Sequence, residues 1–192
     1  MGKRIIIFAS GNGSNAENII SYFKEKNTAE IILVVSNKAD AKVLERAKKN
    51  KVASLFVPKE EVATSTKFLE ILKDLEPDLI VLSGFLLKFP LHILKVFENK
   101  VINIHPALLP KYGGKGMYGK HVHQAVYDAS EKETGITIHY VNENYDEGAI
   151  IFQKSVELSE KDTPVVIAEK IQKLEQEYFP KVIEKLLLVE KK

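Results

Sequence analysis

The chain of 192 residues contains no cysteine, which excludes a disulfide framework, a thiolate metal site and a cysteine nucleophile. It also lacks an excess of either charge: 28 Lys and Arg oppose 26 Asp and Glu, for a formal net charge of +2. Such a balance does not indicate nucleic acid or an anionic membrane as a partner. No apolar run is long enough for a membrane span or a secretion signal, because Gly11 and Gly13 interrupt the first one. We therefore expect a cytoplasmic protein that binds neither nucleic acid nor membrane.

The composition that remains is typical of one globular domain. Hydrophobic residues make up 45% of the chain, and no linker, repeat or low-complexity tract divides it. The only local run of lysines, Lys48, Lys49 and Lys51, falls at the end of an expected helix, where a solvated face is a sufficient explanation. We predict a single domain over residues 1–192.

Apolar runs alternate with helical patterns through the first two thirds of the chain. The expected strands are residues 4–9, 31–35, 54–57, 78–83 and 101–104. The expected helices follow Asn15 and cover 41–49, 66–75, 91–97 and 120–129. This alternation predicts an α/β fold with a Rossmann-like, open, mostly parallel twisted sheet and helices on both faces.

The last third of the chain changes pattern. Residues 136–141 and 149–158 read as strands joined by a turn-like segment, which predicts an antiparallel hairpin at one sheet edge. A helix is expected over Thr163 to Val189, with Pro180 as a kink or break.

A glycine loop stands between the first strand and the first helix. Backbone N–H groups at a helix start bind anions, so Gly11, Asn12, Gly13, Ser14 and Asn15 are candidate phosphate-binding residues. The same letters satisfy the dinucleotide pattern GxGxxA, which leaves a nicotinamide-dependent oxidoreductase as an alternative. That pattern also requires an acidic residue at the end of the second strand, where this chain has Ser-Asn-Lys.

Two polar side chains mark the end of the fifth expected strand, just before Pro106. Successive strand side chains alternate faces, so Asn103 and His105 share one face at a separation of about 6.6 Å. Asn103 can donate an amide hydrogen, and His105 can exchange a proton near neutral pH. A packed histidine beside a loop is the simpler alternative.

The hairpin turn supplies a carboxylate that can serve this histidine. We expect Asp146 to pair with His105 and to raise its pKa above the usual value of about 6.5, giving a poised general acid. An ordinary Asp-x-Gly turn is the alternative, and Glu143 and Glu147 are rival carboxylates.

The remaining histidines give no reason to expect a metal. His121 and His123 are two residues apart on an expected helix and cannot share a face. His139 lies in an expected strand, where packing is the favoured role. We predict no metal site.

Three motifs together resemble the phosphoribosylglycinamide (glycinamide ribonucleotide) branch of the folate-dependent formyltransferases. They are SGNGSN after the first strand, NIHPALLPKYGGKG after the fifth, and YDEG in the hairpin. The resemblance covers nearly the whole chain and implies the formyltransferase fold. It also implies transfer of a formyl group from 10-formyltetrahydrofolate, a co-substrate, to the amine of phosphoribosylglycinamide in purine synthesis. These small molecules would be its partners, with the chain a monomer or homodimer.

The resemblance also implies roles for the matching residues. Asn103, His105 and Asp146 would be the catalytic set. Substrate would be held by Gly11, Asn12, Gly13, Ser14, Asn15, Pro106 and Glu175, the last contacting the ribose. The folate would be held by Leu86, Leu87, Lys88, Phe89, Asn103, Glu143, Asn144 and Asp146. The loop from Gly113 to Gly119 is longer than is common in this family.

Two alternatives to formyl transfer remain open at this point. One is the oxidoreductase that would use the Gly11/Gly13 loop. The other is a non-catalytic module that binds a phosphorylated metabolite, for which Asn103, His105 and Asp146 would be dispensable.

Overall fold

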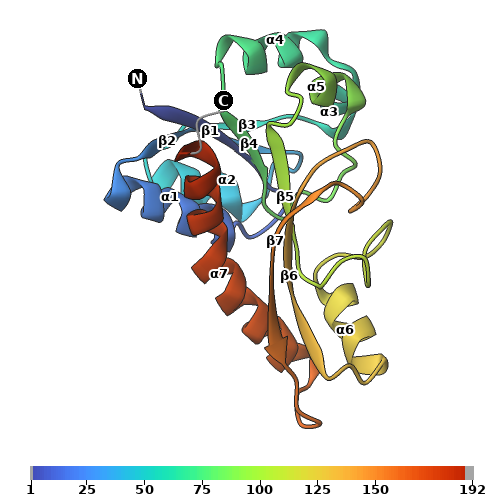
Figure 1. Ribbon diagram of the computed structural model, residues 1–192. Coiled ribbons are helices and arrows are strands. Elements are labelled where there is room, and N and C mark those ends of the chain that lie inside the picture. The colour runs from blue at the N-terminus through green and yellow to red at the C-terminus, as the bar shows by residue number, and fades with distance from the viewer. Residues whose placement is uncertain (1, 189–192) are drawn as a thin grey trace.

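Seven strands form one sheet in the order β3-β2-β1-β4-β5-β6-β7. Figure 1 shows the helices arranged around this sheet. The computed structural model describes residues 2–188. The strands are β1 (Lys3–Phe8), β2 (Ala29–Ser36), β3 (Ser54–Phe56), β4 (Leu79–Leu82), β5 (Val101–His105), β6 (Glu133–Tyr140) and β7 (Ile150–Glu157). The helices are α1 (Ser14–Lys26), α2 (Lys42–Lys49), α3 (Lys59–Thr64), α4 (Thr66–Asp74), α5 (Leu91–Val96), α6 (Lys120–Asp128) and α7 (Pro164–Leu188).

Strand direction reverses only in the last two pairs of the sheet, between β5 and β6 and again between β6 and β7. The strands β3, β2, β1, β4 and β5 are parallel neighbours, whereas β6 is antiparallel to β5 and β7 is antiparallel to β6. The predicted mostly parallel sheet with a late antiparallel hairpin at one edge is therefore confirmed.

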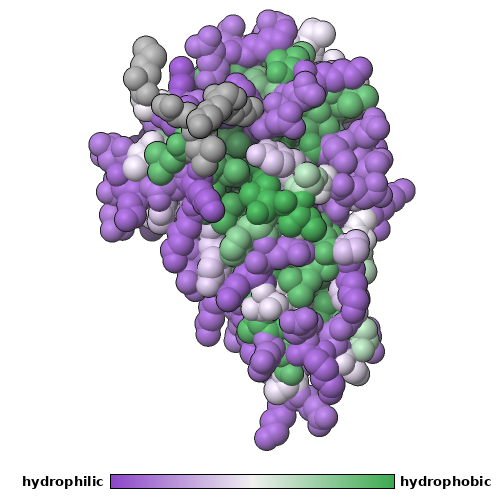
Figure 2. Space-filling view, viewed as in Figure 1, coloured by the Kyte–Doolittle hydropathy of each residue, from purple (hydrophilic) through white to green (hydrophobic). Residues whose placement is uncertain are grey.

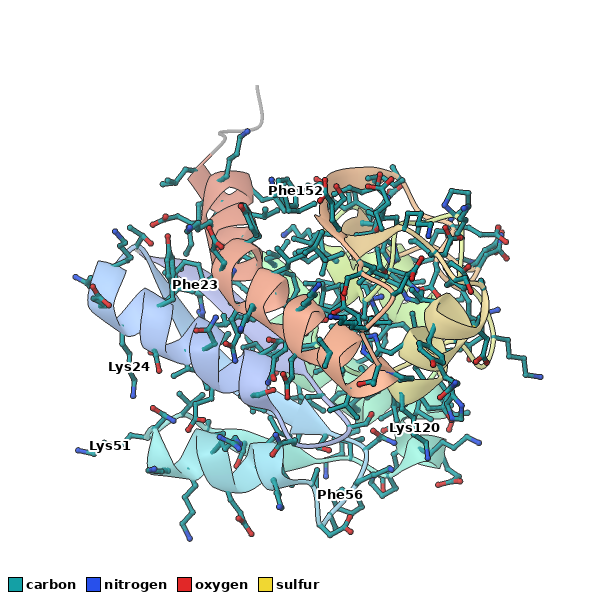
Figure 3. All side chains as sticks on the ribbon, turned by 90° about the horizontal axis from the view of Figure 1, so that it is seen from below. Phe23, Lys24, Lys51, Phe56, Lys120 and Phe152 are labelled. Carbon is teal, nitrogen blue, oxygen red and sulfur yellow. The ribbon has the colours of Figure 1, made fainter. Side chains whose placement is uncertain are left out.

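Alternation along the central strands divides the core between the two faces of the sheet. Val81 of β4 packs in the same cluster as Phe23 of α1 and Ile171 of α7. Its neighbour Leu82 packs in a second cluster with residues of α4 and α5, including Phe68 and Ile93. Figure 3 shows α7 lying across α1 on the first of these faces, with Phe23 of α1 close to α7. Both faces of β4 are thus buried, as its continuous apolar run predicts.

The structure differs from the sequence prediction at two elements. Helix α3 was not expected, because it is six residues long and buries only Val62, too little to produce a helical periodicity. Helix α7 runs through Pro180 without the break that was considered. Phe179, Pro180 and Ile183 are all buried in α7, and this packing offsets the hydrogen bond that proline cannot donate. The expected last residue of this helix, Val189, lies outside the described residues.

The surface carries the charged side chains where the sequence predicts them. Lys48, Lys49 and Lys51 are exposed, and Figure 3 shows Lys51 pointing away from the molecule. On the face drawn in Figure 2, apolar surface gathers near the centre beside α7, and hydrophilic side chains surround it. Among the helices within residues 2–188, none combines the length and the apolar character that crossing a membrane requires.

Gly135 of β6 provides a test of the tight packing at the hairpin. A Cβ built on Gly135 would overlap the Lys154 backbone of β7 and the Leu108 side chain. We expect Gly135→Ala to lower the free energy of unfolding by about 1–3 kcal/mol, the usual cost of overpacking. Urea denaturation would measure it, with Gly2→Ala as the control because a Cβ at Gly2 meets nothing within 4 Å. An unchanged denaturation midpoint for Gly135→Ala would show that the hairpin can shift to make room.

Candidate active site

The carboxyl ends of the parallel strands meet at a cleft of about 760 Å³. Strand β1 lies between β2 and β4, so the chain leaves β1 toward one edge of the sheet and returns on its other side. Ligands of open α/β sheets bind beyond the strand ends at this reversal. All the predicted substrate-binding residues line the cleft, namely Gly11, Asn12, Gly13, Ser14, Asn15, Pro106 and Glu175.

The glycine loop occupies one end of the cleft in a conformation that requires glycine. Gly13 has φ 74° and caps the N-terminus of α1. A Cβ at Gly13 would overlap Val43 of α2, so both the backbone angle and the space exclude other residues. The backbone N–H of Val43 donates to Gly11 O at 3.1 Å, which anchors the loop to α2.

Arg46 of α2 braces the same loop from outside the cleft. Its Nε donates to Asn12 O at 2.8 Å and its Nη2 donates to Asn12 Oδ1 at 3.1 Å. Its Nη1 forms an ion pair with Glu17 in the first turn of α1. The guanidinium therefore joins the loop, the first turn of α1 and α2, a role that sequence analysis did not single out.

Asn15 and Glu175 meet at the same end of the cleft although 160 residues separate them. Asn15 Nδ2 donates to Glu175 Oε2 at 2.8 Å. Burial raises the pKa of the Glu175 carboxyl, and the hydrogen bond from Asn15 opposes that rise. Helix α7 thus delivers a carboxyl group beside the glycine loop, as the resemblance implies for a ribose contact.

The three predicted catalytic residues gather at the middle of the cleft. His105 Nδ1 lies 3.5 Å from Asp146 Oδ2, and both side chains are largely buried. Asp146 has φ 57°, a left-handed conformation that Asp and Asn tolerate better than most residues. Of the three carboxylates in the turn, Asp146 is the one that faces His105. Glu147 instead accepts a hydrogen bond from Asn144.

The expected direction of the His105 pKa shift is wrong. Burial lowers the pKa of His105 below its ordinary value, and the nearby Asp146 carboxylate opposes this only in part. Burial also resists ionisation of Asp146, but the two histidines beside it and the hydrogen bond from the Gly114 N–H together bring the pKa of Asp146 below its ordinary value. At neutral pH the pair therefore consists of a neutral imidazole beside a carboxylate.

His139 belongs to this cluster, which sequence analysis missed. It is buried, as expected for a packed histidine, but its Nε2 lies 3.1 Å from Asn103 Nδ2 and 3.6 Å from Asp146 Oδ1. Its Nδ1 lies 2.9 Å from Tyr140 O, an acceptor, so Nδ1 carries the hydrogen and Nε2 accepts from Asn103. One amide hydrogen of Asn103 is thereby used, and the other stays available. The register pairing Asn103 with His139 across β5 and β6 brings the two together.

The loop after β5 holds both partners of the His105–Asp146 pair. His105 Nε2 donates to Tyr112 O at 2.7 Å, and the Gly114 N–H donates to Asp146 Oδ2 at 2.9 Å. The Tyr112 hydroxyl in turn donates to Glu131 Oε1 at 2.8 Å, which fastens this turn to the segment after α6.

The predicted folate-binding residues divide between two hollows. Leu86, Leu87, Lys88, Phe89, Asn103, Asn144 and Asp146 line the main cleft. Glu143 lines only a neighbouring hollow of about 460 Å³, which Lys88, Phe89 and Asn144 line as well. The segment after β4 is tied to the glycine loop, since Leu86 N–H donates to Ser10 Oγ at 2.9 Å. Ser10 Oγ donates onward to Asn37 Oδ1 at 2.6 Å.

Residues 3–183 match the family described as Formyl transferase. Because the match covers most of the chain, the chain belongs to the formyl transferase family.

Two of the similar proteins are named phosphoribosylglycinamide formyltransferase, and a third is named a purine biosynthetic protein. The chain is 40% identical over 190 residues to the phosphoribosylglycinamide formyltransferase of Bacillus subtilis, covering 96% of this chain and 95% of that protein. It is 33% identical over 186 residues to the trifunctional purine biosynthetic protein adenosine-3 of Gallus gallus, and the match covers 94% of this chain and 18% of that protein. The crystal structure of phosphoribosylglycinamide formyltransferase from Bacillus halodurans superposes with a TM-score of 0.89 at 34% identity, covering 98% and 97% of the two chains. The family resemblance predicted from the motifs is confirmed.

The burial of His105 predicts how stability depends on pH. Its folded-state pKa lies below its unfolded value, so the unfolded chain binds protons more readily once the pH falls below about 6.5. We expect the free energy of unfolding to fall between pH 7 and pH 5, by at most about 1.4 kcal/mol per pH unit for each such histidine. His105→Gln should make this decline shallower in urea titrations. Equal slopes for the parent and His105→Gln would contradict the lowered pKa.

Proposed function

We propose that this chain transfers the formyl group of 10-formyltetrahydrofolate to the amine of phosphoribosylglycinamide. The observation that carries the proposal is the arrangement of the cleft: an anion-binding loop at one end and the Asn103, His105 and Asp146 cluster at its middle. Family membership favours this reaction over the oxidoreductase and the non-catalytic module. We further propose a single domain over residues 1–192 that acts in the cytoplasm as a monomer or homodimer without a metal.

The ribonucleotide would lie at the glycine-loop end of the cleft. The loop N–H groups at the start of α1 would bind its phosphate, and Glu175 would accept hydrogen bonds from ribose hydroxyls. The folate head group would lie against residues 86–89 and the hairpin turn. This order places the glycinamide amine and the formyl carbon between the two ends, beside Asn103 and His105.

Attack of the amine on the formyl carbon forms a tetrahedral oxyanion. The amide hydrogen of Asn103 that His139 does not use is a donor for this oxygen. The His105 Nε2–H becomes a second donor when it exchanges Tyr112 O for the oxyanion. Donors of this kind lower the barrier by about 2.7–4 kcal/mol each.

Proton balance assigns the neutral His105 a second task. The attacking amine loses one proton and the departing folate nitrogen gains one. In the neutral ring Nε2 carries the hydrogen, so Nδ1 is the nitrogen that can accept the first proton, by way of water, and the Asp146 carboxylate 3.5 Å from it stabilises the imidazolium that results. The imidazolium then gives its Nε2 proton to the folate nitrogen as the carbon–nitrogen bond breaks, and the ring is neutral again with its hydrogen on Nδ1.

Appearance of deformylated folate in the presence of both substrates tests the proposal. We expect product only when phosphoribosylglycinamide and 10-formyltetrahydrofolate are mixed with the protein, followed by the absorbance of the folate. Thermal unfolding provides the comparison with the oxidoreductase, because a ligand at 100 times its Kd stabilises by about 2.7 kcal/mol. Protection by NADH, with neither folate protection nor formyl transfer, would overturn the proposal.

Asp146→Asn tests the role of the carboxylate. Asparagine tolerates the same left-handed backbone, so the variant should fold normally. We expect kcat to fall by about 10²–10⁴-fold while KM for both substrates changes little, because the imidazolium loses its counter-charge. Glu147→Gln in the same turn is the matched control and should keep parental kcat. A parental kcat for Asp146→Asn from pH 6 to pH 8 would rule the carboxylate out.

A further inference from the structure

Four buried side-chain polar atoms have no hydrogen-bond partner within residues 2–188: Asn15 Oδ1, Ser83 Oγ, His92 Nε2 and His123 Nδ1. Three of the four residues, Asn15, Ser83 and His123, line the main cleft. Burying a polar group without a partner costs free energy, so such atoms are rare in folded proteins and gather where a ligand completes them. Asn15 already belongs to the glycine-loop end of the cleft, whereas Ser83 has no role in the site as described so far.

Ser83 is placed at the cleft by the last hydrogen bond of its strand. Its backbone N–H donates to Phe8 O at 2.9 Å, so the pairing with β1 extends one residue beyond β4. The residue is 6% exposed, and its Cα is held between the glycine loop after β1 and the end of β5. A rigid strand end therefore fixes the position of the hydroxyl.

The alternation of side chains along β4 determines which face of the sheet the Ser83 hydroxyl points to. Val81 packs with the residues of α1 and α7, and Leu82 packs with those of α4 and α5. Ser83, two residues after Val81, points to the α1 and α7 face. On that face the cleft is lined by Asn15 and by Ile171 and Glu175 of α7. Asn103, which pairs with Leu82 across β4 and β5, points to the opposite face.

We propose that Ser83 Oγ is a binding contact for the sugar–glycinamide portion of the ribonucleotide and contributes to selection of that substrate. The inference rests on the proposed function, which places a phosphoribosyl amine at this end. A hydroxyl both donates and accepts, so it can pair with a ribose oxygen or with an N–H of the glycinamide group. The glycine loop supplies the donors for the phosphate, so the Ser83 hydroxyl, at the end of the neighbouring strand, is assigned to the sugar and amide.

Ser83→Ala separates a ligand contact from a structural role. Removing an unpaired buried hydroxyl takes away no intramolecular hydrogen bond, so the melting temperature of the protein alone should equal or exceed that of the parent. Titration calorimetry should show a Kd for phosphoribosylglycinamide about two- to tenfold weaker, the range for one net hydrogen bond. The Kd values for 10-formyltetrahydrofolate and for inorganic phosphate should not change.

Ser36→Ala is the matched control. Ser36 is also fully buried at a strand end, but its Oγ accepts a hydrogen bond from the Lys38 N–H at 3.2 Å and it lies outside the cleft. This variant should melt at a lower temperature than the parent and bind the ribonucleotide normally.

The outcomes distinguish this inference from the proposed function. If the parent binds the ribonucleotide and transfers formyl groups, but Ser83→Ala binds it equally well, the Ser83 contact is wrong and the function stands. A lower melting temperature for Ser83→Ala, with unchanged affinity, would assign the hydroxyl a structural role and also overturn the contact. A parent protein that neither binds the ribonucleotide nor forms product would refute the proposed function itself.

Discussion

The site depends on one carboxylate held between two buried histidines. Asp146 lies 3.5 Å from His105 Nδ1 and 3.6 Å from His139 Nε2, and each histidine comes from a different strand. This contact requires that β6 return antiparallel to β5 and that the hairpin turn fold back over the strand ends. The left-handed backbone at Asp146 and the close approach of Gly148 to Tyr140 O are the local features that make the turn reach that far. The Gly114 N–H then fixes the carboxylate from the other side.

Much of the fold could be read from the sequence because its signals are local. Both faces of β1 and β4 are buried, so each strand appears in the sequence as a continuous apolar run. Later in the chain two strand patterns follow each other without a helix between them, and this change indicates the hairpin. The signal fails where burial is slight or where tertiary packing prevails. Helix α3 buries a single residue, and α7 tolerates Pro180 because the side chains around it lie in the core.

That Asn103, His105 and Asp146 lie close together could be predicted from the sequence, but the electrostatics of the cluster could not. Asn103, His105 and Asp146 lie at a strand end and a turn, positions where polar residues stand out from their surroundings. His139 sits inside an apolar strand, and only the register of β6 against β5 shows that it faces Asn103. The direction of the His105 pKa shift depends on how much water the fold removes, which a sequence does not state. Arg46 contacts residues that are distant in the chain, and the cleft that Ser83 lines is built from distant segments, so no local pattern marks either residue.

The hydroxyl of Ser10 joins three strand ends at once. It accepts from Leu86 N–H after β4 and donates to Asn37 after β2, while its own backbone continues β1 into the glycine loop. The spacing between the two ends of the cleft is therefore set by the distance between neighbouring strands, about 4.8 Å. A transfer reaction requires the attacking atom and the attacked atom to lie within about 3–3.5 Å of each other. The hydrogen bonding between strands, which forms with the sheet, fixes the relative position of the two substrate sites.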